Sequence, residues 1–138
     1  MVKLFVGIKG SGKTKRMIDM ANDSNNNGDG SVVFINKDSR LMYNLHYNIR
    51  FVSLEEYDIE DVSTYIGFIY GILSSDHDIE VVYIDSLLKH VSIHMDDVPY
   101  FLEKLMKIGK SRNVQFNVSL SSSVEDLPEA VKKYTILE

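Results

Sequence analysis

The chain has 138 residues, of which 20 are acidic and 15 are basic, and it contains no cysteine. This length suits one domain, 1–138, and the lack of cysteine excludes disulfides and thiolate metal sites. The net charge of −5, without a basic block, does not support binding of nucleic acid or of an anionic membrane by charge alone.

The first half of the chain alternates short apolar runs with helical patterns. Residues 2–6 predict a buried strand that leads into a glycine-rich turn. A helix is expected from Lys13 to about Asn22, ending before the three asparagines that follow. Two more strands are predicted at 32–35 and 49–52, and an amphipathic helix at 59–73.

The second half continues the alternation. We expect a strand at 81–84 that ends in Asp85, a helix at 98–108 and a strand at 114–120. A last helix around 127–133 and a sixth strand at 134–137 follow. Strands that alternate with helices predict an α/β fold of three layers, with a mostly parallel sheet of five or six strands and helices on both faces.

Two further kinds of site have little support. His90 and His94 are four residues apart, as in a helical metal pair, but no carboxylate accompanies them in a recognised pattern. No apolar run approaches the ~20 residues of a membrane-spanning helix, and the N-terminus lacks a signal-like pattern. We therefore expect a cytoplasmic protein without membrane insertion.

The glycine-rich turn carries the clearest chemical motif. Residues 7–14, Gly-Ile-Lys-Gly-Ser-Gly-Lys-Thr, match the pattern Gly-x₄-Gly-Lys-Ser/Thr between a strand and a helix. Glycines let several backbone N–H groups point at one phosphate, Lys13 would pair with the β- and γ-phosphates, and Thr14 would bind Mg²⁺ through its hydroxyl. The residues expected to bind a nucleotide, ATP or GTP, are Gly7, Gly10, Ser11, Gly12, Lys13 and Thr14.

Asp85 is the second candidate. It ends a buried strand, at the edge where ligands of open α/β sheets bind. It looks like a Walker B aspartate, which would hold Mg²⁺ through water or accept a hydrogen bond from Thr14. The alternative is an aspartate that caps the turn near Ser86.

Together, residues 7–14 and the strand ending in Asp85 make the chain resemble the P-loop NTPase superfamily, in its RecA-like, additional-strand branch. It also resembles small bacterial ATP-binding proteins that are sometimes labelled twitching motility ATPases. The resemblance implies that the strand at 114–120 lies between the strands at 2–6 and 81–84. It also implies a glutamate after the Walker B aspartate, where this chain has Ser86.

Without that glutamate, we expect slow hydrolysis. Asp38, Glu55 and Glu56 follow neighbouring strands and could activate water instead, or they are solvated loop carboxylates. Ser119, which ends the strand at 114–120 with the serines at 121–123, could sense the γ-phosphate or belong to an ordinary turn.

The sequence thus favours a slow NTPase or nucleotide-dependent switch, with Lys13 and Asp85 in the reaction, Mg²⁺ as cofactor and an unidentified protein partner. One alternative is a small-molecule or nucleoside kinase. The other is a catalytically weak assembly module, which the serine at position 86 favours.

Overall fold

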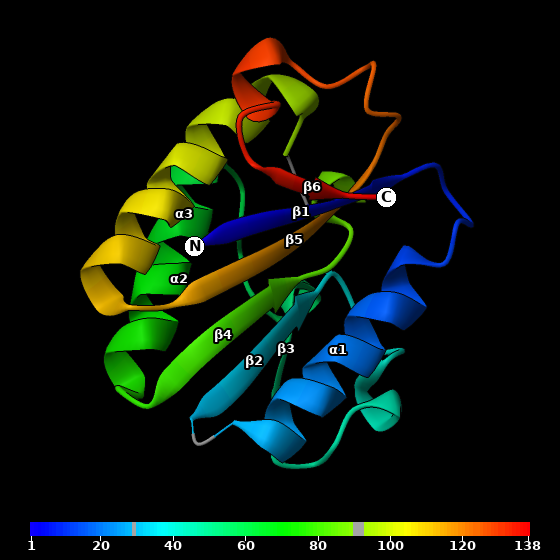
Figure 1. The fold of residues 1–138 in the computed structure, drawn as a ribbon. Coiled ribbons are helices and arrows are strands. Elements are labelled where there is room, and N and C mark those ends of the chain that lie inside the picture. Colours follow the sequence, from blue (N-terminus) through cyan, green and yellow to red (C-terminus); the bar gives the residue numbers. More distant parts are fainter. Residues whose placement is uncertain (29, 90–92) are drawn as a thin grey trace.

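The computed structural model describes residues 1–28, 30–89 and 93–138. In chain order, its strands are β1 (Val2–Gly7), β2 (Ser31–Asn36), β3 (Arg50–Ser53), β4 (Ile79–Ile84), β5 (Gln115–Ser121) and β6 (Thr135–Leu137). Its α-helices are α1 (Lys13–Asn27), α2 (Val62–Ser75) and α3 (Val98–Arg112) (Figure 1). Short 3₁₀ turns lie at Met42–Asn44, Leu54–Glu56, Leu87–Lys89, Met95–Asp97 and Glu129–Val131. The expected α/β fold is confirmed.

The strands form one sheet of six in the order β3-β2-β4-β5-β1-β6, and every neighbouring pair is parallel. β5 lies between β1 and β4, as expected. The register pairs Gly7 with Ser121 and Ile84 with Val118, so the carboxyl ends of β1, β5 and β4 lie along one edge of the sheet. This edge therefore brings the turn after β1 and the residue after β4 close together.

Helices cover both faces of the sheet, which confirms the three layers (Figure 1). On one face, α2 and α3 pack together, with the rings of Tyr65 and Phe101 5.0 Å apart. On the other face, Met17 and Ala21 of α1 lie in a core cluster with Phe34 of β2. Because both faces are covered, β1 and β4 are largely apolar on both sides, whereas β5 also buries the polar side chains of Asn117 and Ser119.

α2 begins at Val62, later than the sequence pattern predicts, because Asp61 caps it. The Asp61 carboxylate accepts a hydrogen bond from the Thr64 backbone N–H at 2.7 Å. Such a cap satisfies one of the first-turn donors and fixes the start of a helix. None of the described helices has the length and apolar character needed to cross a membrane.

The predicted end of the first helix near Asn22 is wrong, because α1 continues to Asn27. Tertiary contacts outweigh the low helix propensity of asparagine there. The Asn22 side chain donates to the Asn44 carbonyl and accepts from the His46 N–H. Two residues further, the Ser24 hydroxyl lies 2.7 Å from the Tyr83 hydroxyl of β4.

The predicted helix at 127–133 is also wrong, since only the 3₁₀ turn Glu129–Val131 forms there. Pro128 precedes this turn with an extended ψ of 145°. Proline has no N–H to donate and disfavours helical geometry in the residue before it. The chain then enters β6, the predicted sixth strand.

Candidate functional site

The glycine-rich loop, residues 7–14, connects β1 to α1 at the carboxyl edge of the sheet. Gly10 and Gly12 have φ angles of 83° and 90°, in the left-handed region that favours glycine. A Cβ on Gly7 would lie 2.6 Å from Ser11 Oγ, so a side chain there would require the Ser11 hydroxyl to move. The sequence pattern of the loop therefore follows from its backbone path.

The start of α1 suits an anion. Gly12 is the N-cap, and the described structure shows no side-chain cap on the first-turn N–H groups. Uncapped N–H groups and the positive end of the helix dipole together attract a negative group. The loop and the helix start could thus bind a phosphate.

The side chain of Lys13 folds back onto the glycine-rich loop. Its Nζ donates to the Gly7 carbonyl at 2.7 Å and to the Ile8 carbonyl at 3.0 Å. Partial burial lowers the pKa of the Lys13 ammonium from its ordinary value, while the Asp85 carboxylate opposes this shift and Lys89 adds to it. The loop carbonyls thus hold the ammonium of Lys13 within the glycine-rich loop.

Next to the loop lies a cavity of about 300 Å³, which we call the loop cavity. Lysines line it from both sides: Lys9, Lys13 and Lys15 come from the loop and α1, and Lys89 comes from the turn after β4. The Lys15 ammonium is already paired with Asp19 at 3.0 Å. The remaining cations would attract a phosphate-bearing ligand.

Asp85 links three elements of the structure. The Thr14 hydroxyl on α1 donates to its carboxylate at 3.0 Å, and the Ser119 hydroxyl on β5 donates at 2.8 Å. Ser119 in turn accepts from the Ser86 N–H at 2.6 Å. Asp85 is 1% exposed and Ser119 is fully buried. The Thr14 contact anticipated for Asp85 is therefore present.

Ser86 follows Asp85 with a φ of 55°, in the left-handed region. The donation from its N–H to Ser119 holds it in this conformation. Ser86 lines the loop cavity and also a neighbouring space of about 260 Å³, the aspartate cavity, which Thr14 and Asp85 line as well. The residue at position 86 thus faces the space between the loop and Asp85.

The oxygen atoms of Thr14 and Asp85 fit a small divalent cation. Mg²⁺ prefers oxygen ligands and is often held by one or two protein groups together with substrate phosphates and water. Among the described residues, no cluster of three or more His, Cys, Asp or Glu side chains could hold a metal alone. The donor set therefore suits Mg²⁺ shared with a phosphate better than a metal caged by protein.

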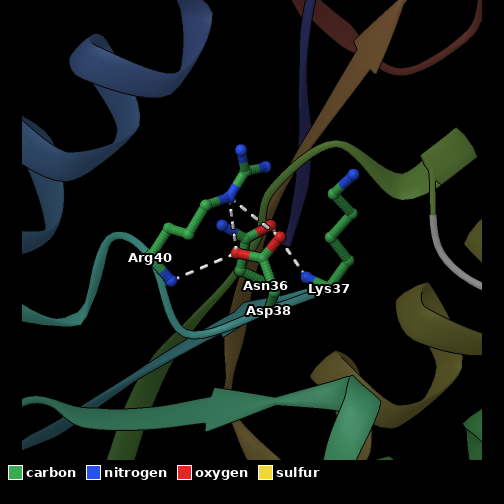
Figure 2. Close-up of polar contacts among 4 residues, drawn as sticks. All are labelled: Asn36, Lys37, Asp38 and Arg40. Atoms are coloured by element: carbon green, nitrogen blue, oxygen red, sulfur yellow. Dashed lines mark hydrogen bonds and ion pairs between the residues drawn. The ribbon is translucent and has the colours of Figure 1, made fainter.

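Asp38 also reaches the aspartate cavity, from the end of β2. Figure 2 shows its carboxylate turned toward Arg40, whose Nε lies 3.1 and 3.0 Å from the two oxygens and whose backbone N–H also donates. These bonds from Arg40 hold the pKa of the Asp38 carboxyl below its ordinary value. Asp38 is thus near Asp85, but it is engaged by a cation.

Glu55 and Glu56 lie elsewhere. Both are exposed in the 3₁₀ turn after β3, and neither lines the loop cavity or the aspartate cavity. Only the backbone of Glu55 is tied to this region, through its N–H to the Lys37 carbonyl at 3.0 Å. Of the three candidate acids, the structure brings only Asp38 close to Asp85.

A third cavity, of about 390 Å³, lies between the glycine-rich loop and β6. Phe5 and Leu137 give it apolar walls, and Arg16 lies at its rim. The Arg16 guanidinium stands 5.3 Å from the centre of the Phe5 ring and donates to the Glu138 carbonyl at 3.1 Å. This β6 cavity could accept a planar apolar group joined to a phosphate on the loop.

Sequence reasoning missed Lys89, which lines both the loop cavity and the aspartate cavity. Its position soon after Asp85 was the available signal, because chain that follows a strand stays near the same sheet edge. The sequence analysis also missed Arg16, one helical turn after Gly12.

Of the pair His90 and His94 considered above, His90 lies outside the described residues, so the structure does not test this pair.

No protein-family model matches the chain, and the search of curated proteins gave no match either. The site must therefore be interpreted from its own geometry.

Proposed function

We propose that this chain is a Mg²⁺-dependent nucleoside triphosphate-binding domain of the P-loop type. The observation that carries the proposal is the arrangement of Lys13, Thr14 and Asp85. The ammonium of Lys13 lies within the loop, and one residue later the Thr14 hydroxyl contacts the carboxylate that ends β4. A phosphate on the loop and a cation beside it would satisfy all three groups.

In this proposal, the N–H groups of the loop and the ammonium of Lys13 hold the phosphates in the loop cavity. Thr14 and Asp85 hold the Mg²⁺, which neutralises charge on the phosphate oxygens. Ser119 keeps the Asp85 carboxylate oriented. The apolar walls of the β6 cavity contact the base or the ribose. Apolar contacts of this kind do not distinguish adenine from guanine, so the proposal includes both ATP and GTP.

We further propose that hydrolysis is slow and that the domain acts as a nucleotide-dependent switch, read by a protein partner in the cytoplasm. Ser86 occupies the position facing the cavities where a carboxylate would orient water, and positioned groups of that kind contribute roughly 10² to 10⁴ in rate. The position of β5 between β1 and β4 supports the additional-strand type over a small-molecule kinase.

The test is a thermal-shift measurement with ATP or GTP and Mg²⁺. A ligand at a hundred times its Kd stabilises the folded state by about 2.7 kcal/mol, which corresponds to several degrees in Tm. Lys13→Ala should remove most of this shift. Lys3→Ala is the control, because Lys3 is an exposed lysine that lines none of the three cavities around the loop.

A shift that survives in Lys13→Ala would place the nucleotide elsewhere and overturn the proposal. Phosphate release at saturating ATP and Mg²⁺ tests the slow turnover separately. A rate near the roughly 10 per second typical of enzymes would contradict the switch. Transfer of the phosphate to an added nucleoside would instead favour the kinase.

A further inference from the structure

The largest cavity described here lies away from the glycine-rich loop. It is a groove of about 580 Å³, lined by residues of α3 and by Lys133 and Tyr134, which precede β6. Figure 1 shows α3 and β6. The groove shares no lining residue with the loop cavity, the aspartate cavity or the β6 cavity. Its lining includes four lysines and two tyrosines: Lys104, Lys107, Lys110, Lys133, Tyr100 and Tyr134.

The groove is basic although the chain as a whole is acidic. Its lining holds four lysines against one acid, Glu103, whereas the chain carries a net charge of −5. In the part of the chain that the structure describes, none of the four ammonium groups forms an ion pair with a carboxylate. Gathering like charges without partners is unfavourable, so the groove favours an anionic ligand.

Aromatic rings position two of these cations. Lys104 Nζ lies 5.3 Å from the centre of the Tyr100 ring, and Lys133 Nζ lies 5.5 Å from that of Tyr134. Tyr134 is buried and forms part of the floor, but Tyr100 is 50% exposed. An exposed ring beside lysines offers a stacking surface next to a phosphate site.

The groove is long enough for more than one phosphate. From Tyr100 to Lys110, α3 rises about 15 Å at 1.5 Å per residue. Lys104, Lys107 and Lys110 follow one another at helical spacing along this length, so their ammonium groups form a track that starts at the aromatic ring. The volume also lies in the range of small-ligand sites, roughly 300 to 1,000 Å³.

We propose that this groove binds a nucleotide unit, with its phosphates on the lysines and its base stacked on Tyr100. The unit is either a free nucleotide or part of a single-stranded nucleic acid, since both present the same phosphate and planar base. This site is separate from the one proposed on the glycine-rich loop, and neither proposal depends on the other.

The experiment uses the Lys13→Ala protein without Mg²⁺, so that binding at the glycine-rich loop does not contribute. Fluorescence anisotropy follows a labelled oligo(dT) of about 15 nucleotides, a length near the upper site size of small single-strand binders. Competition with AMP and ATP tests the free nucleotide. We expect saturable binding that weakens at least tenfold between about 50 and 200 mM salt.

Two variants of exposed residues separate the groove from general charge effects. Lys107→Glu should weaken binding at least about tenfold, because it replaces attraction to phosphate by repulsion. Its matched control is Lys132→Glu, a nearby exposed lysine outside the groove, which should stay within about threefold. Tyr100→Ala should weaken binding at least fivefold by removing the stack, whereas Tyr47→Ala, an exposed tyrosine elsewhere, should not.

Competition by the mononucleotides at the same site would support the proposal with a free nucleotide as the ligand. Binding of oligo(dT) alone would support it with the strand as the ligand. Absence of binding by both at low salt would overturn the proposal. Equal competition by poly-glutamate, with no effect of Tyr100→Ala, would also overturn it, because the groove would then be a surface for acidic proteins.

Discussion

Two aspartates end neighbouring strands of the sheet and differ in what holds them. Asp85 follows β4 and Asp38 lies just after β2, and both line the aspartate cavity. Asp85 is buried and accepts hydrogen bonds from the hydroxyls of Thr14 and Ser119. The side chain of Asp38 is 19% exposed and is paired with the guanidinium of Arg40.

The difference lies in the charge of the donors. Hydroxyl donors orient a carboxylate but leave its negative charge for a cation, whereas a guanidinium neutralises that charge. In the proposed site, Asp85 rather than Asp38 would therefore hold the Mg²⁺. The bonds from Arg40 lower the pKa of the Asp38 carboxyl, which makes it a weaker base toward water.

Asp85→Asn tests this contrast most strongly. The amide keeps the shape but loses the charge, so the Mg²⁺-dependent part of nucleotide affinity should fall by roughly 10- to 100-fold. Isothermal titration calorimetry with and without Mg²⁺ measures it. Asp38→Asn is the matched control and should leave the Mg²⁺-dependent affinity within about threefold. Equal losses with and without Mg²⁺ would show that Asp85 supports the loop rather than a metal.

Ser119→Ala should have the next largest effect. It removes the donor to Asp85 and leaves the Ser86 N–H without its acceptor, a loss of about 1–3 kcal/mol of unfolding free energy. Urea unfolding measures this loss. Ser53→Ala is the control, because Ser53 is a buried serine at the end of β3 whose hydroxyl has no partner among the described residues. Equal losses of unfolding free energy in both variants would show that the hydrogen bonds of Ser119 do not stabilise the fold more than an ordinary buried serine does.

Arg40→Ala should have the smallest effect, at most about 1 kcal/mol, because the Arg40 side chain of the pair is largely exposed to solvent. Arg40 depresses the folded-state pKa of Asp38 below its ordinary value of 3.8. The stability from the pair is therefore fully present above that value and is lost as pH falls through the folded pKa. Thermal melts should show a constant gap to wild type from pH 7 to about 5, which shrinks below pH 4. A gap that persists at lower pH would contradict the pairing.

Hydrophobic pattern was enough to predict most of the fold. The apolar run at 81–84 lies in the buried central strand β4, and the segment at 114–120, in which apolar residues alternate with Gln115, Asn117 and Ser119, lies in β5. Besides the later start of α2, which the Asp61 cap explains, two errors arise where pattern and tertiary contact disagree. Asn22 and Ser24 hold the last turns of α1 against other elements, and a proline interrupts the apolar pattern before β6.

The part of the site that could be predicted from the sequence lies within one continuous segment of the chain. The strand, turn and helix around residues 7–14 lie in one stretch, so the loop and its positive-φ glycines follow from the sequence. The Thr14 partner of Asp85 was anticipated, but its Ser119 partner and the Arg40 partner of Asp38 were not. Ser119 meets Asp85 only because β5 lies beside β4, and no spacing in the sequence shows that Arg40 folds back onto Asp38.

The strand order also governs when the site can form during synthesis. β1 is made first, yet its neighbours in the sheet, β5 and β6, come from the opposite end of the chain. Contacts between distant segments form slowly, because the intervening chain must first be closed into a loop. A nascent chain that ends before β5 therefore carries the glycine-rich loop on an unpaired apolar strand, exposed to aggregation. Nucleotide binding should appear only after the last strands leave the ribosome.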